Sequence, residues 1–352
     1  MTEDALVDHL ELKDFVAALF AHAGMSATDA NTVADILVWA DLRGVESHGV
    51  ERAPRYLALM KGGQIQAAAT PEIQDVAGAA FRVDAKKSSG PVGMIRALNE
   101  AAARARTSGV ALGVVANATH TGAIGYYAEK AAQQGFAAIV MAAGMPLMAW
   151  PGTKVPSIST SPVAIGVPGG PDGVMVFDMS TAIAASGRLR KATLDKKPIP
   201  EGWALDAEGK PATDPAKAVT SLPVGGAKGA GLSLMIEILA GVLGGTPIVA
   251  PMAQPGAQKA HSANGLVILI DIAKFRPLAG FAGDVDLLCS VIKGLPQLEN
   301  AEAVRMPGER GNAELRARQA NGIPLNARLA GTLAKLATEC GVDVPEALKK
   351  FA

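Results

Sequence analysis

The spacing of apolar residues along this chain changes from helical to strand-like and back to helical. Within the first sixty residues, apolar side chains recur three and four positions apart, as at Leu12, Phe15, Val16 and Leu19. From about residue 80, short apolar runs alternate with helical patterns, and the helical spacing returns after Arg316. We therefore predict a central α/β body flanked by helices from both ends of the chain.

Within the central body, short apolar runs bounded by turn residues predict six strands. They are expected at residues 81–84, 109–115, 136–142, 163–167, 174–177 and 266–271. Helical spacing predicts helices through residues 94–102, 126–134 and 232–243. In the N-terminal part, Ser47 is expected to cap a helix that ends near the Lys61-Gly62-Gly63 stop.

The composition excludes several classes of protein. A chain of 352 residues with 49% hydrophobic residues has room for about two domains and a large core. Lys+Arg and Asp+Glu number 33 each and aromatic residues are 4%, so nothing indicates a nucleic-acid binder. The most apolar stretch, residues 229–250, contains Glu237, several glycines and Pro247, and is expected to be a buried helix rather than a membrane span.

Features of the N-terminal residues and of the cysteines indicate the compartment. The N-terminal residues are acidic and amphipathic, without the basic and apolar regions of a signal peptide. Cys289 and Cys340 are too few for a disulfide framework and are expected to be buried thiols. A reducing, cytoplasmic setting fits both observations.

The first candidate site is the segment from Ser47 to Arg52. If Ser47 caps a helix, His48 and Arg52 lie four residues apart on one face, beside free backbone N–H groups. A guanidinium can grip a small carboxylate in a bidentate manner, and an imidazole can pass a proton to an adjacent atom. Ser47 could orient the imidazole. The alternative is an ordinary capped helix with exposed polar residues.

Three further segments are candidates for binding anions, and each has a purely structural alternative. Residues 117–125 include His120 and two glycines between a strand and a helix, which suits phosphate but equally a plain turn. Residues 225–231 combine four glycines with Lys228, which suits phosphate or close helix packing. Residues 305–310 place two arginines around a Pro-Gly turn, for phosphate or for a surface ion pair.

Several standard motifs are missing from the sequence. No Rossmann or P-loop glycine pattern and no G-x-S-x-G nucleophile elbow is found. The five histidines form no short-spaced set with cysteines or carboxylates, so the sequence predicts no metal site.

Seven segments, taken in order, resemble the malate/L-lactate dehydrogenase family of the second type, which is unrelated to the Rossmann dehydrogenases. That group includes sulfolactate, ureidoglycolate and diketogulonate enzymes and the reductases of piperideine- and pyrroline-2-carboxylate. The segments are ADLRGVESHGVERAPRY (40–56), HTGAIGYYAEKA (120–131), STSPVAIGVP (159–168), FDMSTAIAASG (177–187), IPEGWALDAEGKPATDP (199–215), GGAKGAGLSLMIEIL (225–239) and RMPGER (305–310).

The resemblance implies an α/β fold with a non-Rossmann, NAD(P)-binding unit built on a mostly antiparallel sheet. It also implies a helical unit made from both termini and a smaller third unit. The expected divisions are residues 1–70 with 312–352 for the helical unit, 71–120 with 160–311 for the NAD(P)-binding unit, and 121–159 for the small α/β unit. Family members are typically homodimers with the active site near the interface.

The resemblance further implies an oxidoreductase that moves hydride between NAD or NADP and C2 of a small 2-oxo or 2-hydroxy acid. His48 would be the proton donor and Ser47 its relay partner. The substrate would lie near Arg52, Thr160, Thr181 and Ala182. The coenzyme would contact His120, Thr121, Gly122, Ala123, Ile124, Asp178, Met179, Ser180, Lys228, Gly229, Val304, Arg305, Met306, Pro307, Gly308, Glu309 and Arg310.

The chain departs from the family pattern at a few positions. Ser159-Thr160-Ser161-Pro162 stands where the family often has Gly-Thr-Asn-Pro. The residue before Lys228 is Ala227, and Ala230 stands where a tyrosine is common in the family. Imine-reducing members carry an aspartate near the position of Arg188, which Arg188 cannot replace. The departures favour 2-oxo acid chemistry over reduction of a cyclic imine. They also leave open the alternative that the chain is a non-catalytic protein that binds a dinucleotide or a carboxylate.

Overall fold

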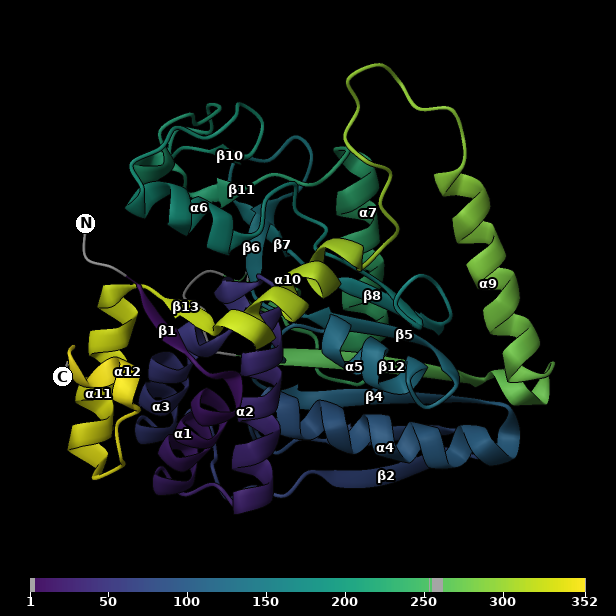
Figure 1. Cartoon of the computed structure of the whole chain (residues 1–352), viewed down its shortest axis with the longest axis horizontal. Coiled ribbons are helices and arrows are strands. Elements are labelled where there is room, and N and C mark those ends of the chain that lie inside the picture. Colours follow the sequence, from purple (N-terminus) through teal and green to yellow (C-terminus); the bar gives the residue numbers. More distant parts are fainter. Residues whose placement is uncertain (1–3, 253, 255–261, 352) are drawn as a thin grey trace.

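A seven-stranded sheet forms the centre of the computed structural model, which describes residues 4–252, 254 and 262–351. Across the sheet the order is β2-β3-β4-β12-β5-β8-β9 (Figure 1). The strands are β2 (Glu72–Ala77), β3 (Ala80–Asp84), β4 (Val110–Ala118), β12 (Ala263–Asp271), β5 (Phe136–Ala143), β8 (Val163–Pro168) and β9 (Val174–Met179). Within the described part of the chain, only the β3–β4 pair of this sheet is parallel. The expected mostly antiparallel, non-Rossmann sheet is confirmed.

Two helices cover one face of this sheet. Helix α4 (Gly90–Ser108) packs on β4 and β12, and α5 (Gly125–Ala132) packs on β5 and β8. Their apolar sides and the strands below them bury Met94, Leu98, Tyr127 and Phe136 almost completely. Each Å² of apolar surface removed from water stabilises the folded state by about 25 cal/mol. This layer is therefore the main core of the central body.

The opposite face is covered less completely. Helix α7 (Ala227–Ile236) continues into a π-helical segment, Glu237–Val242, that contacts β12 and β5. The expectation that residues 229–250 are buried is wrong for about half of this helix. Seven apolar residues are more than a third exposed in the single chain: Leu232, Leu234, Met235, Ile238, Leu239, Val242 and Leu243. No other described segment covers this apolar outer side of the helix.

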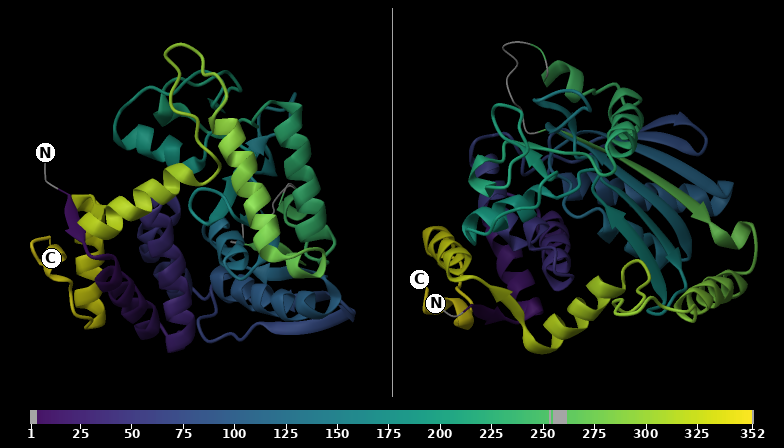
Figure 2. Two further views of the ribbon diagram at one scale, coloured as in Figure 1. Left: turned by 45° about the vertical axis from the view of Figure 1, so that its right-hand side comes forward. Right: turned by 90° about the horizontal axis from the view of Figure 1, so that it is seen from above.

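Both ends of the chain build one helical unit, as expected. Strand β1 (Ala5–Val7) pairs antiparallel with β13 (Ile323–Leu325), so segments from the N-terminal and C-terminal parts of the described chain lie side by side (Figure 2). The helices are α1 (His9–His22), α2 (Ala27–Leu42), α3 (Ala53–Lys61), α11 (Ala327–Cys340) and α12 (Glu346–Lys349). Leu12, Leu37 and Leu333 are fully buried among them. Helix α10 (Glu309–Asn321) contacts α2 and leads the chain back to β13.

A smaller sheet is composed differently from the sequence prediction. Its order is β10-β11-β6-β7, with β10 (Ala204–Leu205), β11 (Thr220–Ser221), β6 (Pro146–Ala149) and β7 (Pro156–Ser159). Of the expected small unit at residues 121–159, α5 and β5 belong instead to the large sheet, because β5 pairs along its whole length with β12. Only β6 and β7 join the smaller sheet, whose other half comes from residues 204–221.

The remaining helices lie at the edges of the molecule. Helix α6 (Ser186–Leu194) contacts the segment Glu46–His48, and α8 (Val249–Met252) is a single turn. Helix α9 (Leu278–Lys293) lies at the right-hand edge of Figure 1 and contacts β8. No helix in the described ranges combines the length and the apolar character needed to cross a bilayer.

Candidate active site

The segment around His48 is a pair of tight turns rather than the start of a helix. Two 3₁₀ turns, Glu46–His48 and Val50–Arg52, precede α3, and the extended Gly49 (ψ −156°) separates them. The predicted helix beginning at Ser47 is therefore wrong. Pro54 occupies the first turn of α3, where a missing N–H costs nothing, and the helix begins there instead.

The turns nevertheless bring the predicted residues together. Ser47 Oγ lies 3.0 Å from His48 Nδ1, and Arg52 Nε donates to the Ser47 carbonyl oxygen at 2.5 Å. The Ser47 carbonyl thus fixes the guanidinium of Arg52 on the same side as the imidazole. The close packing of two short turns thus brings together the residues that helical spacing was expected to align on one face.

Loss of hydration and nearby positive charge set the protonation of His48. Removal of the imidazole from water, followed by Arg52 and Arg190, lowers the pKa of His48 to about 4. Arg190 comes from α6, and its guanidinium lies 2.9 Å from the Glu51 carboxylate. At neutral pH the imidazole is therefore uncharged, and two guanidinium groups keep its surroundings positive.

His120 lies beside His48, although 72 residues separate them. The two ring centroids are 5.3 Å apart, and His120 Nδ1 is 2.5 Å from the hydroxyl of Tyr56. Burial raises the pKa of Tyr56, so its hydroxyl stays protonated and can donate. The Gly122 N–H also donates to His120 Nδ1, at 3.3 Å. With Nδ1 accepting, the proton of a neutral His120 resides on Nε2.

Strand β9 and its continuation connect the predicted coenzyme segments. Asp178 Oδ2 accepts the Gly125 N–H at 2.9 Å, which ties β9 to the loop that carries His120. Burial raises the pKa of Asp178 to about 6, against the lowering effects of the Gly125 N–H and Arg43. Ser180 Oγ donates to the Thr160 carbonyl at 3.0 Å, so the two predicted positions are neighbours.

The loop before α7 joins the end of this strand. The Val224 N–H donates to the Thr181 carbonyl at 2.9 Å, and Ala182 forms a bridge with Pro223. A Cβ at Gly229 would lie 2.4 Å from the Val224 carbonyl oxygen, so only glycine fits there. This close approach places the exposed Lys228 in the first turn of α7, where the helix dipole and the charge of the lysine favour an anion.

Two buried hydroxyl groups near this loop are unsatisfied. Ser161 Oγ and Thr181 Oγ1 have no hydrogen-bond partner among the described residues. Buried polar atoms are nearly always paired, so orphaned hydroxyls indicate a place where a polar ligand completes the set. Together with Lys228, they fit a coenzyme that carries phosphate and amide groups.

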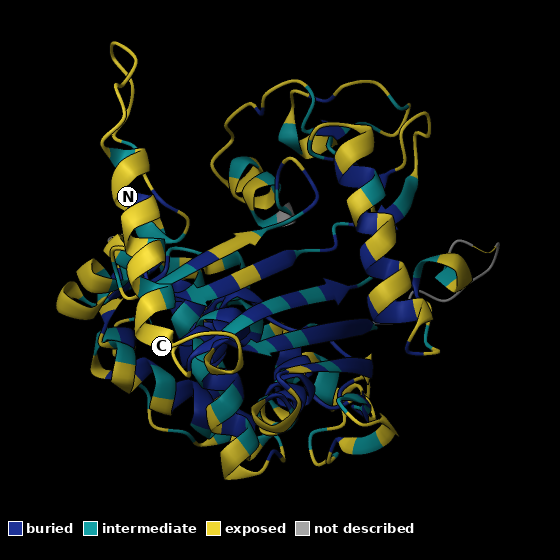
Figure 3. Ribbon diagram, turned by 90° about the vertical axis from the view of Figure 1, so that its right-hand side faces the viewer, coloured by how far each residue is buried: buried dark blue, intermediate teal, exposed yellow. Residues whose placement is uncertain are grey.

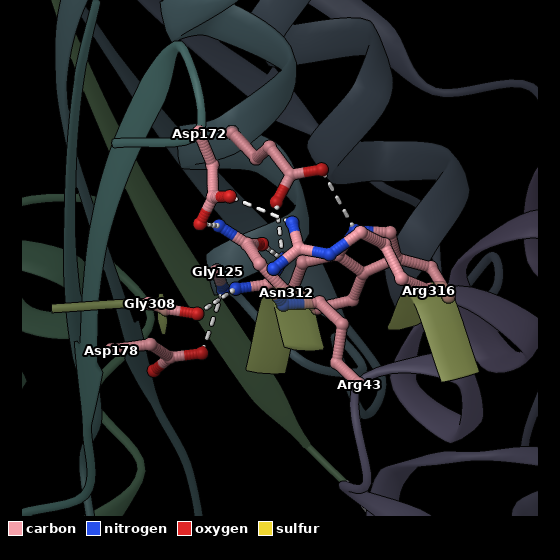
Figure 4. A network of polar contacts seen from close by, with 9 residues as sticks. Arg43, Gly125, Asp172, Asp178, Gly308, Asn312 and Arg316 are labelled. Atoms are coloured by element: carbon pink, nitrogen blue, oxygen red, sulfur yellow. Dashed lines mark hydrogen bonds and ion pairs between the residues drawn. The ribbon is translucent and has the colours of Figure 1, made fainter. Parts of the chain in front are cut away.

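The fourth segment, residues 304–310, contacts β9 at Val176, before Asp178 in the chain (Figure 4). A Cβ at Gly308 (φ 88°) would lie 3.1 Å from the Val176 carbonyl oxygen. Arg43 Nη2 donates to the Gly308 carbonyl at 3.3 Å, and Nη1 of the same buried side chain donates to both Glu129 and Asn312. This turn therefore contacts β9 at Val176, and the loop before α7 contacts the continuation of the strand five residues later, at Thr181.

The side chains of this turn have different roles. Glu309 accepts the Met306 N–H at 2.8 Å and pairs with Lys293, so it stabilises the turn itself. Arg305 and Arg310 line an open cavity of about 570 Å³ beside Asp172. Their position is compatible with an anionic ligand as well as with the ion pair considered from the sequence.

Some residues near the site were not identified from the sequence. Tyr56 follows Arg52 by four positions, a spacing that could have indicated a shared face. Gly187 gave no signal, yet a Cβ there would lie 2.1 Å from the Ser47 Cβ. The adjacent Arg188 is exposed, whereas Ala230 is buried and Ala227 exposed. No three His, Cys, Asp or Glu side chains of the described residues group as a metal site would.

The chain is similar to several known proteins. The sequence model described as malate/L-lactate dehydrogenase matches residues 7–334. A malate/(S)-sulfolactate dehydrogenase of Methanothermus fervidus is 32% identical over 337 residues, covering 95% of this chain and 98% of that protein. A delta(1)-pyrroline-2-carboxylate/delta(1)-piperideine-2-carboxylate reductase of Pseudomonas putida is 34% identical over 243 residues, covering 68% and 71%.

A solved structure shows the same fold. The sulfolactate dehydrogenase of Methanocaldococcus jannaschii superimposes with a TM-score of 0.87 at 32% identity, over 96% of this chain and 98% of that chain. The non-Rossmann sheet and the matching segments define an oxidoreductase class. This chain belongs to the malate/L-lactate dehydrogenase family.

Proposed function

We propose that the protein is an NAD(P)-dependent oxidoreductase of the malate/lactate type. It transfers hydride between the coenzyme and C2 of a small 2-oxo or 2-hydroxy carboxylic acid. The observation that carries this proposal is the meeting of His48 and Arg52 with the His120 loop, at a ring-centroid separation of 5.3 Å between the histidines. A proton donor and a carboxylate ligand thus lie beside a segment suited to the coenzyme.

Each residue of the turn has a defined task in this proposal. Arg52 holds the carboxylate of the acid and orients its C2. In reduction, His48 gives a proton from Nε2 to the substrate oxygen, and in oxidation it takes one back. Ser47 Oγ accepts the Nδ1–H of His48, which leaves Nε2 facing the substrate in both directions. Thr160, Thr181 and Ala182 line the substrate side.

The coenzyme is NAD or NADP, since the name of one relative specifies NADP(+) and that of another NAD(+). When bound, the nicotinamide supplies or accepts the hydride. Lys228 and the N-terminus of α7 would hold a phosphate, and the unsatisfied hydroxyl of Thr181 would meet a polar group of the ligands. The 120–124 loop, residues 178–180, Gly229 and the 304–310 turn would complete the contacts along β9.

A coenzyme assay tests the proposal. Loss of NADH and of NADPH at 340 nm is followed with pyruvate, oxaloacetate and a cyclic imine acid. Turnover of a 2-oxo acid supports the proposal. Preferred turnover of the imine would instead favour the reductase alternative. The similarity to the Pseudomonas reductase supports that alternative, and the exposed Arg188, near the position of the aspartate of imine-reducing members, argues against it. Binding of coenzyme without any turnover would indicate a non-catalytic protein.

Substitution of His48 tests its assigned role. His48→Gln should lower turnover by at least about 10²-fold, because a positioned acid contributes roughly 10²–10⁴-fold. Coenzyme affinity, measured by NADH fluorescence, should stay close to that of the wild type. Unchanged turnover in the purified variant would remove His48 from the mechanism.

The proposal includes a homodimer in a reducing, cytoplasmic compartment. The exposed apolar side of α7 and its π-helical extension supports an interface, because monomers rarely expose large apolar patches. Both cysteines are free thiols, which fits a reducing compartment.

A further inference from the structure

Asp41 is a buried carboxyl group for which the proposed chemistry has no role. It lies in the last turn of α2 and is only 2% exposed. Burial is the main reason that the pKa of Asp41 is raised well above its ordinary value, with smaller opposing effects from the Val50 N–H and Arg318. Burying a carboxyl group is costly, so its retention calls for a structural reason.

The carboxyl group contacts the chain between His48 and Arg52. Asp41 Oδ2 accepts the Val50 N–H at 2.7 Å, and this bond is buried. On the other side, a Cβ at Gly49 would lie 1.9 Å from Asp41 Oδ1, so the carboxyl rests directly against the Gly49 backbone. The Gly49 carbonyl in turn accepts the Arg52 N–H at 2.9 Å. Asp41 therefore holds the junction between the two 3₁₀ turns.

Other contacts fix the position of Asp41 itself. Its backbone carbonyl accepts a hydrogen bond from Arg318 Nη1 of α10 at 2.7 Å. Arg318 also pairs with Glu46 at 2.6 Å, at the start of the first turn. The end of α2, the His48 turns and the C-terminal α10 are thus joined around one residue.

We propose that Asp41 is a positioning residue that sets the relative placement of His48 and Arg52 by holding the backbone of Gly49 and Val50. Its carboxyl group is buried against the Gly49 and Val50 backbone and takes no part in the proposed chemistry. Without this acceptor, the Val50 N–H loses its buried partner and the two turns can separate. The imidazole would then gain water and move away from the guanidinium.

A measurement on His48 tests this without any turnover. The imidazole signals of labelled protein are titrated by NMR, and His48 is assigned by comparison with His48→Gln. In the wild type we expect a midpoint near the pKa of about 4. In Asp41→Ala the midpoint should rise by at least about one pH unit, because the imidazole becomes better hydrated and lies further from the Arg52 guanidinium. Asp41→Asn, which keeps an acceptor for Val50, should restore the wild-type value.

A second buried aspartate provides the matched control. Asp271 is also 2% exposed and accepts the Ala273 N–H at the start of a 3₁₀ turn, but it lies at the end of β12. Asp271→Ala should reduce thermal stability and leave the His48 midpoint unchanged. An equal shift of the midpoint in both alanine variants would overturn the proposal.

Kinetics give an independent readout, which rests on the proposed function. Asp41→Ala should lower kcat and raise KM for the acid, together at least about tenfold in kcat/KM, while the Kd for NADH changes less than twofold. Asp41→Asn should recover most of this loss. If the wild type turns over no acid, the proposed function fails, but the NMR comparison still decides the role of Asp41.

A double-mutant cycle covers the case in which Asp41→Ala folds poorly. Gly49→Ala pushes a methyl group into the Asp41 carboxyl and should disturb the turn by itself. In Asp41→Ala/Gly49→Ala the clash is relieved, so the loss in kcat/KM should be smaller than the product of the single losses. If Asp41→Ala does not fold but Asp41→Asn does, two results together support the proposal. The His48 midpoint of Asp41→Asn should equal that of the wild type, and the His48 midpoint of Gly49→Ala should be displaced. Purely multiplicative effects, or a wild-type midpoint in Asp41→Ala, contradict it.

Discussion

The imidazole of His48 has a depressed pKa because it is poorly hydrated and faces Arg52 and Arg190. A neutral imidazole is ready to accept a proton from a hydroxy acid. A bound carboxylate adds negative charge close by, which favours the protonated form needed to reduce an oxo acid. The two guanidinium groups therefore affect His48 differently in the free protein and with substrate bound.

This environment predicts opposite pH dependences for the two directions. In oxidation, kcat/KM should be flat from pH 5 to pH 8, because His48 is deprotonated throughout this range. In reduction, kcat/KM should fall by about tenfold per pH unit above pH 5, as the protonated fraction falls. Initial rates measured in both directions check this. An oxidative limb with a midpoint near the ordinary histidine value would contradict it.

The guanidinium of Arg52 cannot be replaced by a simple positive charge. Arg52→Lys should raise KM for the acid by roughly tenfold or more, because lysine lacks the planar fork and cannot hold the Ser47 carbonyl and a carboxylate together. The kinetic measurement is paired with Arg96→Lys, an exposed arginine of α4. Equal KM values for the two variants would count against carboxylate binding at Arg52.

Helix α6 limits the space around the serine of the turn. Gly187 lies in its first turn, and the Ser47 side chain occupies the place of a Cβ at this position. Arg190, three residues further on, reaches Glu51 of the second 3₁₀ turn. Residues of the chain's middle thus complete a site whose reactive groups come from its N-terminal part.

A methyl group at Gly187 should disturb Ser47 directly. Gly187→Ala should lower kcat by about tenfold or more, because Ser47 can no longer orient His48, and should leave NADH affinity unchanged. Gly283→Ala in α9 is the control, since nothing lies within 4 Å of its added Cβ. That change should be neutral or stabilise by about 0.5–1 kcal/mol. Wild-type kcat in Gly187→Ala would contradict the close packing.

At the scale of the whole molecule, apolar surface remains uncovered on two helices. The outer side of α7 and its π-helical extension is exposed, and so are Leu287, Leu288 and Val291 of α9 (Figure 3). Both helices flank the face of the large sheet that α4 and α5 leave open. A second copy of the chain would bury these surfaces in a homodimer.

Charge introduced on this surface should separate the subunits. Sedimentation at micromolar concentration should give a dimer for the wild type and a lighter species for Leu288→Asp/Val291→Asp. Val76→Asp, at an equally exposed apolar position on the edge strand β2, should leave the mass unchanged. A monomeric wild type would contradict the homodimer.

The sequence by itself determined the order of elements, because hydrophobic period and turn residues act over a few neighbouring residues. Six predicted strands and the terminal helices appear in the structure within a few residues of their expected bounds. The resemblance also indicated the mostly antiparallel, non-Rossmann type of the large sheet.

Tertiary structure decided the rest. The Val50 N–H is held by Asp41 instead of continuing a helix from Ser47, and β5 joined the large sheet because β12, more than a hundred residues later, pairs with it. The contact between His48 and His120 likewise depends on chain segments that meet only in the folded molecule. Such choices depend on partners distant in sequence, which local spacing does not encode.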